Sequence, residues 1–144
     1  EDCAAIAFRF ASGALATSSV TLGAAGDETR IRFVFDGLTA TSGSVPYAPA
    51  TGEWKFAARD PARQRDVDAI VARHAGAAAG FEGYLGAVAR ALAGKDPSAV
   101  TYADGYLSIS LVTAIYAAAR SGQSQDLPLP IAHPMRLGWR PEGV

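Results

Sequence analysis

Hydrophobic and polar residues alternate through the first half of the chain with the two-residue period of β-strands. In segments 4–10 and 29–35 an aliphatic or aromatic residue stands at every second position, which is the pattern of a strand with one buried face. Further strands are predicted at 14–22, where small and hydroxyl residues predominate, and at 38–42 and 54–58. The first half should therefore form a sheet.

Short turns join these predicted strands into antiparallel pairs. Ala11-Ser12-Gly13 separates the first two strands, which should form a hairpin. Asp36-Gly37 is a strong two-residue hairpin signal, because glycine accepts the positive φ that a tight turn requires. The segment 43–52 is rich in glycine and proline and is expected to be a loop.

The second half of the chain changes to a helical period. Asp60-Pro61 predicts a helix start, with an N-cap acceptor followed by proline. Segment 80–93 repeats apolar residues at helical spacing and should end at Gly94 and Pro97. The predicted inner face of the first of these helices comprises Val67, Ile70, Val71 and His74, and that of the second comprises Phe81, Tyr84, Leu85, Val88 and Leu92.

A third, longer helix is predicted before residue 122. Thr101 and Asp104 have the spacing of a capping box, and Gly122 is a typical helix stop. The residues expected to face the sheet are Leu107, Leu111, Val112, Ile115 and Ala119. Strands first and helices later predict an α+β fold, with an open-faced, mainly antiparallel sheet and helices packed on one face, in a single domain over 1–144.

Composition narrows the function classes. Thirteen basic and fourteen acidic side chains are scattered along the chain, so neither a nucleic acid nor an anionic membrane is an expected partner. No apolar run approaches the roughly 20 residues that span a bilayer. Cys3 is the single cysteine and is interpreted as a strand residue. We therefore expect no intrachain disulfide and no metal site, and we expect the protein to be located in the reducing cytoplasm.

The single methionine, Met135, lies near the far end, so the chain as written does not begin at a translation start. No remnant of a signal peptide precedes the first predicted strand. We therefore expect a domain excised from a longer protein rather than a processed secreted one.

Several short motifs carry a resemblance to a known family. They are Glu1-Asp2-x-Ala4 with Phe10 and Gly13-Ala14, the Asp36-Gly37 turn, Asp104-Gly105, and Ala114-Ile115-Tyr116 followed by Gly122 and Leu127-Pro128; the tail from His133-Pro134 to Gly138-Trp139-Arg140-Pro141 adds to them. In this order they resemble the C-terminal domain of the Gfo/Idh/MocA oxidoreductases, the relatives of glucose–fructose oxidoreductase and inositol dehydrogenase.

The resemblance implies a parent enzyme that moves hydride between NAD or NADP and a sugar, polyol or similar substrate. Its cofactor would be held by an N-terminal Rossmann domain that this chain lacks, and the family's catalytic E-K-P and D-x-x-x-H motifs are also absent here. Glu53-Trp54-Lys55 is not E-K-P, and Lys95 lies in a predicted turn. We therefore expect no catalytic, cofactor-binding or metal residue in this chain, which alone should be inactive. The family's habits also imply a homodimer, or a higher homo-oligomer, formed through the sheet face.

For each remaining candidate residue or motif, a structural role is a better explanation than a catalytic or binding role. Gly23-Ala24-Ala25-Gly26 has the wrong spacing for a dinucleotide loop. His74 is expected to be a partly buried or capping histidine, and His133 part of an extended tail. Ser42-Gly43-Ser44 lacks a nucleophile elbow, and carboxylate pairs among the following residues are expected by chance: Asp66, Asp68 and Glu82.

Ser19, Thr21 and Arg30 are the residues that could contact a hydroxyl-rich substrate, because the related strands border the cleft in the family. Exposed polar positions on a solvated sheet explain them more simply, so the substrate-binding residues stay unassigned. The alternative function is a stand-alone dimeric α+β module that binds a small ligand or a protein.

Overall fold

The computed structural model describes residues 2–49, 51–76, 78–95 and 98–139. The chain divides into two compact units, one made of Glu1–Leu22 with Val100–Val144 and the other of Gly23–Ala99. We call them the hairpin unit and the sheet unit. The motif residues Glu1, Pro97, Arg140 and Pro141 lie outside the described residues.

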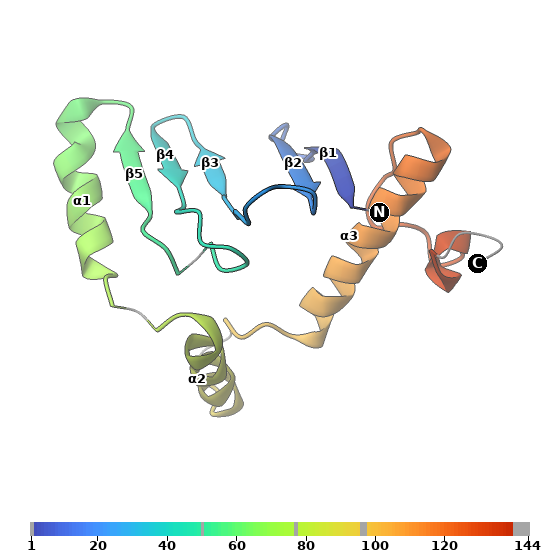
Figure 1. Ribbon diagram of the computed structural model, residues 1–144. Helices are drawn as coiled ribbons and strands as arrows, with labels where there is room; N and C mark the ends of the chain where they lie inside the picture. The colour runs from blue at the N-terminus through green and yellow to red at the C-terminus, as the bar shows by residue number, and fades with distance from the viewer. Residues whose placement is uncertain (1, 50, 77, 96–97, 140–144) are drawn as a thin grey trace. The chain divides into compact units, whose positions relative to one another are not determined.

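The hairpin unit begins with two antiparallel strands, β1 (Cys3–Arg9) and β2 (Leu15–Thr21) (Figure 1). Gly13 turns the chain between them with a φ of 87°, a conformation that glycine adopts without a Cβ clash. The predicted hairpin is therefore confirmed. Ile6 and Phe8 are half-buried, whereas Phe10 beyond the strand is exposed.

Helix α3 (Tyr102–Ser121) is the long helix of the same unit, and its two ends form as expected. The Asp104 carboxylate accepts hydrogen bonds from the N–H and the hydroxyl of Thr101, both at 2.7 Å. At the other end Gly122 adopts the left-handed conformation with a φ of 65°. The capping box and the glycine stop are both confirmed.

The face of α3 that becomes buried is not the predicted one. The buried residues follow a helical spacing and are all small: Ser110, Thr113, Ala114 and Ala117. Leu129, which is 3% exposed, packs with Ala114 and Ala117, and Met135 joins this cluster. Small side chains let the returning C-terminal segment approach the helix closely, whereas the predicted face leaves Leu107 59% exposed.

The C-terminal segment is held on α3 by Arg136 and Trp139. Arg136 donates to the carbonyls of Pro130 and Leu129, at 2.9 and 2.6 Å, and to the Tyr106 hydroxyl at 2.7 Å. Trp139 stacks on Tyr116 with ring centroids 5.1 Å apart. The segment includes the 3-10 helix η2 (Pro134–Leu137), so the tail is not fully extended as predicted, because local turns let it fold back on the helix.

The sheet unit contains a three-stranded antiparallel sheet in the order β3 (Arg32–Val34), β4 (Leu38–Thr41), β5 (Lys55–Ala58). The hairpin at Asp36-Gly37 forms, with Phe35 N–H donating to the Leu38 carbonyl at 2.8 Å. The positive φ that was predicted for the turn glycine is wrong, because Gly37 is not among the residues with positive φ. The Gly37 carbonyl instead accepts the Arg59 N–H at 3.0 Å, which orients the turn peptide.

Helix α1 (Gln64–Arg73) follows a single 3-10 turn, η1 (Pro61–Arg63), that Asp60 caps through Ala62 N–H at 2.9 Å. It lies beside β5 in Figure 1. The Gln64 amide accepts from Ala58 N–H at 2.9 Å and donates to the Phe56 carbonyl at 3.0 Å. One side chain thus occupies the edge of β5 as a neighbouring strand would.

Helix α2 (Gly80–Leu92) forms where it was predicted and ends before Gly94, whose φ is 70°. Its apolar face is not covered by the described residues of the sheet unit. Phe81, Leu85 and Leu92 are 84%, 62% and 86% exposed, and none of the helix residues is buried.

The predicted α+β class is confirmed, because the described residues form antiparallel strands together with the helices α1, α2 and α3. The described strands form two hydrogen-bonded sheets, β1–β2 and β3–β4–β5, rather than one continuous sheet. Within the described part of the chain, no helix combines the length and the apolar character that crossing a membrane requires.

Candidate functional site

The sheet of β3, β4 and β5 has two chemically different faces. Residues directly opposite one another share a face, and the register places Phe33, Ala40 and Phe56 in one row. The neighbouring row on the opposite face consists of Arg32, Thr41 and Lys55. One face therefore carries the aromatic rings, and the other carries this polar row beside the mixed row of Val34, Thr39 and Ala57.

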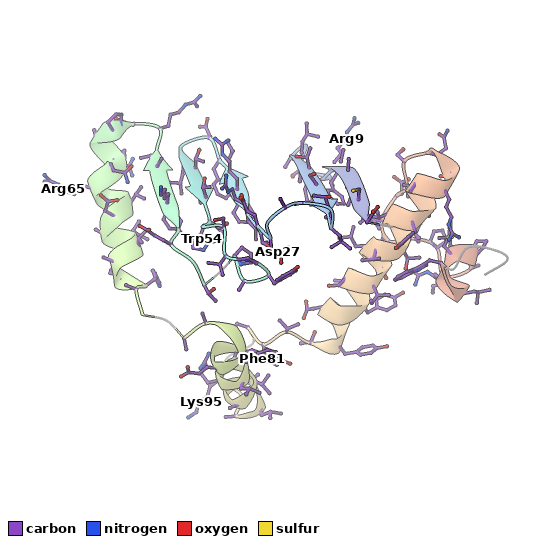
Figure 2. All side chains as sticks on the ribbon, viewed as in Figure 1. Arg9, Asp27, Trp54, Arg65, Phe81 and Lys95 are labelled. Atoms are coloured by element: carbon purple, nitrogen blue, oxygen red, sulfur yellow. The ribbon has the colours of Figure 1, made fainter. Side chains whose placement is uncertain are left out.

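The aromatic face is a continuous layer of four rings. Phe33 stacks on Phe35 and on Trp54 with centroids 6.3 Å apart in both pairs, and Trp54 stacks on Phe56 at 6.1 Å. The layer covers Ala40, which is only 5% exposed, but leaves Phe33 49% exposed on its own outer side. We call these four rings the aromatic layer; Trp54 is labelled in Figure 2.

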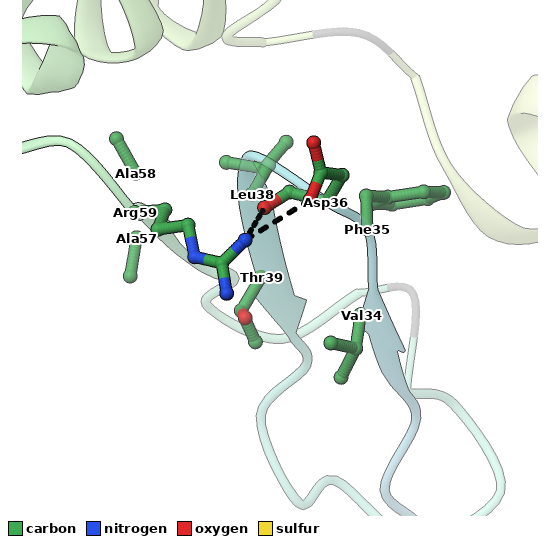
Figure 3. A pocket seen from close by; sticks show the side chains of 8 residues that line it. All are labelled: Val34, Phe35, Asp36, Leu38, Thr39, Ala57, Ala58 and Arg59. Atoms are coloured by element: carbon green, nitrogen blue, oxygen red, sulfur yellow. Dashed lines mark hydrogen bonds and ion pairs between the residues drawn. The ribbon is translucent and has the colours of Figure 1, made fainter.

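At the turn end of the sheet, residues from all three strands line an open depression of about 440 Å³ (Figure 3). Its lining consists of Val34, Phe35, Asp36, Leu38, Thr39, Ala57, Ala58 and Arg59. Arg59 donates to the Asp36 carboxylate at 3.0 Å and to its carbonyl at 3.1 Å. Both side chains are largely exposed, so this ion pair contributes little to stability.

The polar side chains that line this depression are suited to binding a polar ligand. Its polar groups are one guanidinium, one carboxylate and the Thr39 hydroxyl, with no cysteine, histidine or lysine in the lining. A nucleophile with an adjacent base, the arrangement that covalent or acid–base catalysis needs, is not present there. Arg59 and Thr39 could instead donate hydrogen bonds to a polar ligand.

The three residues considered for substrate contact belong to different units. Ser19 and Thr21 lie on β2 in the hairpin unit, where Cys3 Sγ is 3.3 Å from Thr21 Oγ1. Arg30 belongs to the sheet unit, precedes β3 and pairs with Glu28 at 2.8 Å. Cys3 lies on β1 as expected, but its side chain is exposed.

The histidines and Ser42 have local structural roles. His74 is the C-cap residue of α1, as expected, but it is exposed rather than partly buried. His133 Nδ1 accepts from Met135 N–H at 3.2 Å and so caps η2. Ser42 is 6% exposed, and its hydroxyl donates to the Gly43 carbonyl and accepts from Ile31 N–H, so it is not a free nucleophile.

The remaining candidates also have local partners or open surroundings. Asp66 pairs with Arg63 at 3.0 Å, and Asp68 accepts from Gln64 at 2.8 Å. Lys55 and Lys95 are exposed, as predicted. The segment 23–26 runs between two strands and does not lead into a helix, so it lacks the geometry of a dinucleotide loop.

Asp104 titrates away from its ordinary range. Hydrogen bonds from the Thr101 hydroxyl and then from the Thr101 N–H lower the pKa of this carboxyl below its usual 3.8. Both donors stabilise the ionised form. Because these hydrogen bonds form the capping box at the start of α3, the lowered pKa results from helix capping and does not indicate a reactive site.

Sequence reasoning did not find Gln64, Arg136 or Trp139 as organising residues. Each acts through partners that are distant along the chain or that only the folded geometry brings within reach. A residue pattern with period two or 3.6 contains no signal for such contacts.

Comparison with known proteins places the chain in no group, since no family model, curated protein or solved structure matches it. Among residues 2–139, apart from the four that the structure does not describe, no group of histidine, cysteine and carboxylate side chains is arranged to hold a metal ion.

Both units expose large apolar side chains. Among the described residues, Leu15 on β2 is 75% exposed, and Phe35 and Phe81 of the sheet unit are 60% and 84% exposed. Phe81 on α2 is labelled in Figure 2. Surface of this kind marks sites of contact with other protein.

Proposed function

We propose that this chain is the substrate-side and assembly-forming domain of an NAD(P)-dependent oxidoreductase of the Gfo/Idh/MocA type. Its parent would act on a sugar, a polyol or a similar hydroxyl or carbonyl substrate, in the cytoplasm. The chain alone would be inactive, because the dinucleotide and the proton-transfer residues would belong to a Rossmann domain.

The observation that carries this proposal is the uncovered apolar surface on both the sheet and α2. Phe33 and Phe35 are 49% and 60% exposed, and Phe81 is 84% exposed. Burying an aromatic side chain of this size contributes about 1.5–3 kcal/mol. Such residues are therefore expected to be covered in the working protein, by a Rossmann domain and by a second subunit.

The division of labour in such an enzyme also fits the chemistry of the described side chains. The nicotinamide would supply hydride transfer when bound to its own domain. This chain offers the hydroxyl donors of Ser19 and Thr21 on β2 and the Arg59 guanidinium just after β5, which suit a hydroxyl-rich ligand. None of them is arranged as a base beside a nucleophile.

Calorimetry with NAD(H) and NADP(H) tests the proposal. The chain alone should bind neither dinucleotide at micromolar concentration. The product of the complete reading frame that encodes this chain should bind one of them and oxidise a sugar or polyol. Failure of that longer protein to bind any dinucleotide would reject the oxidoreductase proposal.

The second candidate is a stand-alone dimeric module that binds a small ligand or a protein. The open depression beside Arg59 favours it, because this depression is contained within the sheet unit. The fluorescence of an apolar dye such as ANS distinguishes the two. A stand-alone module should bind little dye once dimeric, whereas a domain that lacks its Rossmann partner should still bind dye strongly.

A further inference from the structure

His133 begins the short helix η2 as a hydrogen-bond acceptor. Its Nδ1 accepts the N–H of Met135 at 3.2 Å, which caps the first turn of η2. Pro134 has no N–H, so the N–H of Met135 is the first donor of this helix that needs a partner. A ring nitrogen that accepts a hydrogen bond carries no proton, so the neutral ring holds its proton on Nε2. The cap therefore requires a neutral His133.

The same residue closes the turn that positions Arg136. The His133 carbonyl accepts the Arg136 N–H at 3.0 Å. The Arg136 guanidinium in turn donates to the carbonyls of Leu129 and Pro130. The Pro130 carbonyl also accepts the N–H of His133, at 3.0 Å. His133 and the guanidinium thus meet at one carbonyl oxygen, so loss of the cap should weaken the hold of Arg136 on the segment.

The charges around η2 are unfavourable for a second proton on the ring. Arg136 lies within η2, and Arg120 of α3 donates to Met135 Sδ at 3.5 Å. The remaining titratable partner on α3 is Tyr106, whose hydroxyl accepts from Arg136. Among the described residues of the hairpin unit, no carboxylate pairs with His133, Arg120 or Arg136. An imidazolium would therefore be a third positive charge without a carboxylate partner.

We propose that the C-terminal segment, residues 129–139, is a pH-sensitive clasp on α3 that opens when His133 takes up a second proton. Histidine is the side chain that changes its charge between about pH 5 and 8. Protonation turns Nδ1 from an acceptor into a donor that faces the N–H of Met135, and two donors do not bond each other. Because the closed clasp requires the neutral ring, closure is complete at higher pH and is lost as the pH falls.

Opening of the clasp uncovers the small-residue face of α3. Leu129 packs on Ala114 and Ala117 when the clasp is closed. Farther along the segment, Trp139 donates its Nε1–H to the Thr113 hydroxyl at 3.2 Å. All of these residues belong to the hairpin unit, and none of them enters the oxidoreductase proposal. The clasp is therefore independent of that proposal.

Nitrogen-15 labelling of methionine tests the cap directly, because Met135 is the single methionine of the sequence. Hydrogen exchange of its amide, corrected for the intrinsic rate at each pH, measures the protection that the cap provides. In the wild type this protection should be about fivefold lower at pH 5 than at pH 8, the equivalent of one hydrogen bond.

Two substitutions at residue 133 serve as matched controls. His133→Asn retains a side-chain acceptor that does not titrate, so its protection should be the same at both pH values. His133→Ala lacks the acceptor and should resemble the protonated wild type even at pH 8. Protection in the wild type that does not change with pH, pH dependence that persists in His133→Asn, or full protection in His133→Ala would overturn the proposal.

The fluorescence of Trp139 follows the clasp as a whole. In a Trp54→Phe background Trp139 is the remaining tryptophan, and its emission reports whether its ring stays stacked on Tyr116. Between pH 8 and pH 5 the emission should move to that of a solvated indole, but not when His133→Asn is added. His74→Gln removes the other histidine, the C-cap of α1, and should leave the transition intact. A transition that disappears with His74→Gln, or no transition at all, would contradict the clasp.

Discussion

Helices α2 and α3 have similar local sequence signals but different surroundings. Both were predicted from apolar periodicity, and both form. On α3 the alanines 114 and 117 are 5% exposed beneath Leu129, whereas on α2 no residue is buried. Local sequence therefore determined where these helices form but not which of their faces is covered.

The difference comes from the segment that follows each helix. After α3 the chain turns at Gly122 and returns along the helix, where the Arg136 guanidinium bonds two backbone carbonyls. Helix α2 ends before Gly94, and the described residues that follow it do not fold back along the helix. A covering segment with its own polar anchor is what separates a packed helix from an exposed one.

The largest change in the free energy of unfolding is expected when Leu129→Ala is compared with Leu92→Ala. Leu129 is 3% exposed and Leu92 is 86% exposed. Removing the buried side chain leaves a cavity and should lower the free energy of unfolding by about 2–4 kcal/mol, while the exposed substitution should change it by less than about 0.5 kcal/mol. Urea denaturation followed by circular dichroism measures both. Equal effects would mean that Leu129 is not part of a packed core.

Arg136→Ala tests the anchor, with Arg65→Ala on α1 as the control. The substitution removes hydrogen bonds to the Leu129 and Pro130 carbonyls and to the Tyr106 hydroxyl. We expect a loss of about 1–2 kcal/mol in unfolding free energy, and no rescue by Arg136→Lys, because an ammonium lacks the planar fork. Arg65 is exposed and should tolerate alanine. Full rescue by lysine would show that charge alone holds the segment.

Two helical glycines should respond oppositely to alanine. Gly105 on α3 has open space where a Cβ would stand, so Gly105→Ala should stabilise the protein by about 0.5–1 kcal/mol. At Gly83 on α2, an added Cβ would overlap the Ala78 carbonyl oxygen, so the backbone must shift and the helix should lose stability. Thermal unfolding of the two variants measures the sign. A stabilising Gly83→Ala would show that the Ala78 contact is not maintained.

The smallest effect expected is the pH dependence of the α3 start. Bonds from Thr101 lower the pKa of Asp104 below its usual 3.8. The ionised carboxylate is favoured in the folded state, so its contribution is complete above that usual value and is lost as the pH falls through the lowered pKa. Helicity measured from pH 6 to pH 2 should fall less steeply in Asp104→Asn than in the wild type. Identical profiles would show that the cap does not titrate.

Periodicity and end signals were sufficient to predict most of the elements. The first hairpin, the capped start at Thr101 and the stop at Gly122 depend on contacts within a few residues, and sequence contains these directly. The strand predicted over 29–35 is shorter in the structure, where β3 covers only Arg32–Val34. The alternation of apolar and polar residues indicates which side chains share a face of the strand, but the length of β3 is set by its pairing with β4.

Packing and the candidate site were not predictable in the same way. The buried face of α3 is a row of small residues, which apolar periodicity does not favour. The row becomes buried only because Leu129 returns to it from beyond Gly122. The depression beside Arg59 likewise requires three strands in register, and no single-sequence pattern encodes that long-range pairing.

Gln64 protects one edge of the three-stranded sheet against further pairing. Its amide occupies the hydrogen-bonding positions at Phe56 and Ala58 that an additional strand would need. Unpaired N–H and C=O groups along a strand are a template for pairing with other chains and for aggregation. A single glutamine side chain therefore closes the β5 edge to strand addition, without a further strand in the sheet.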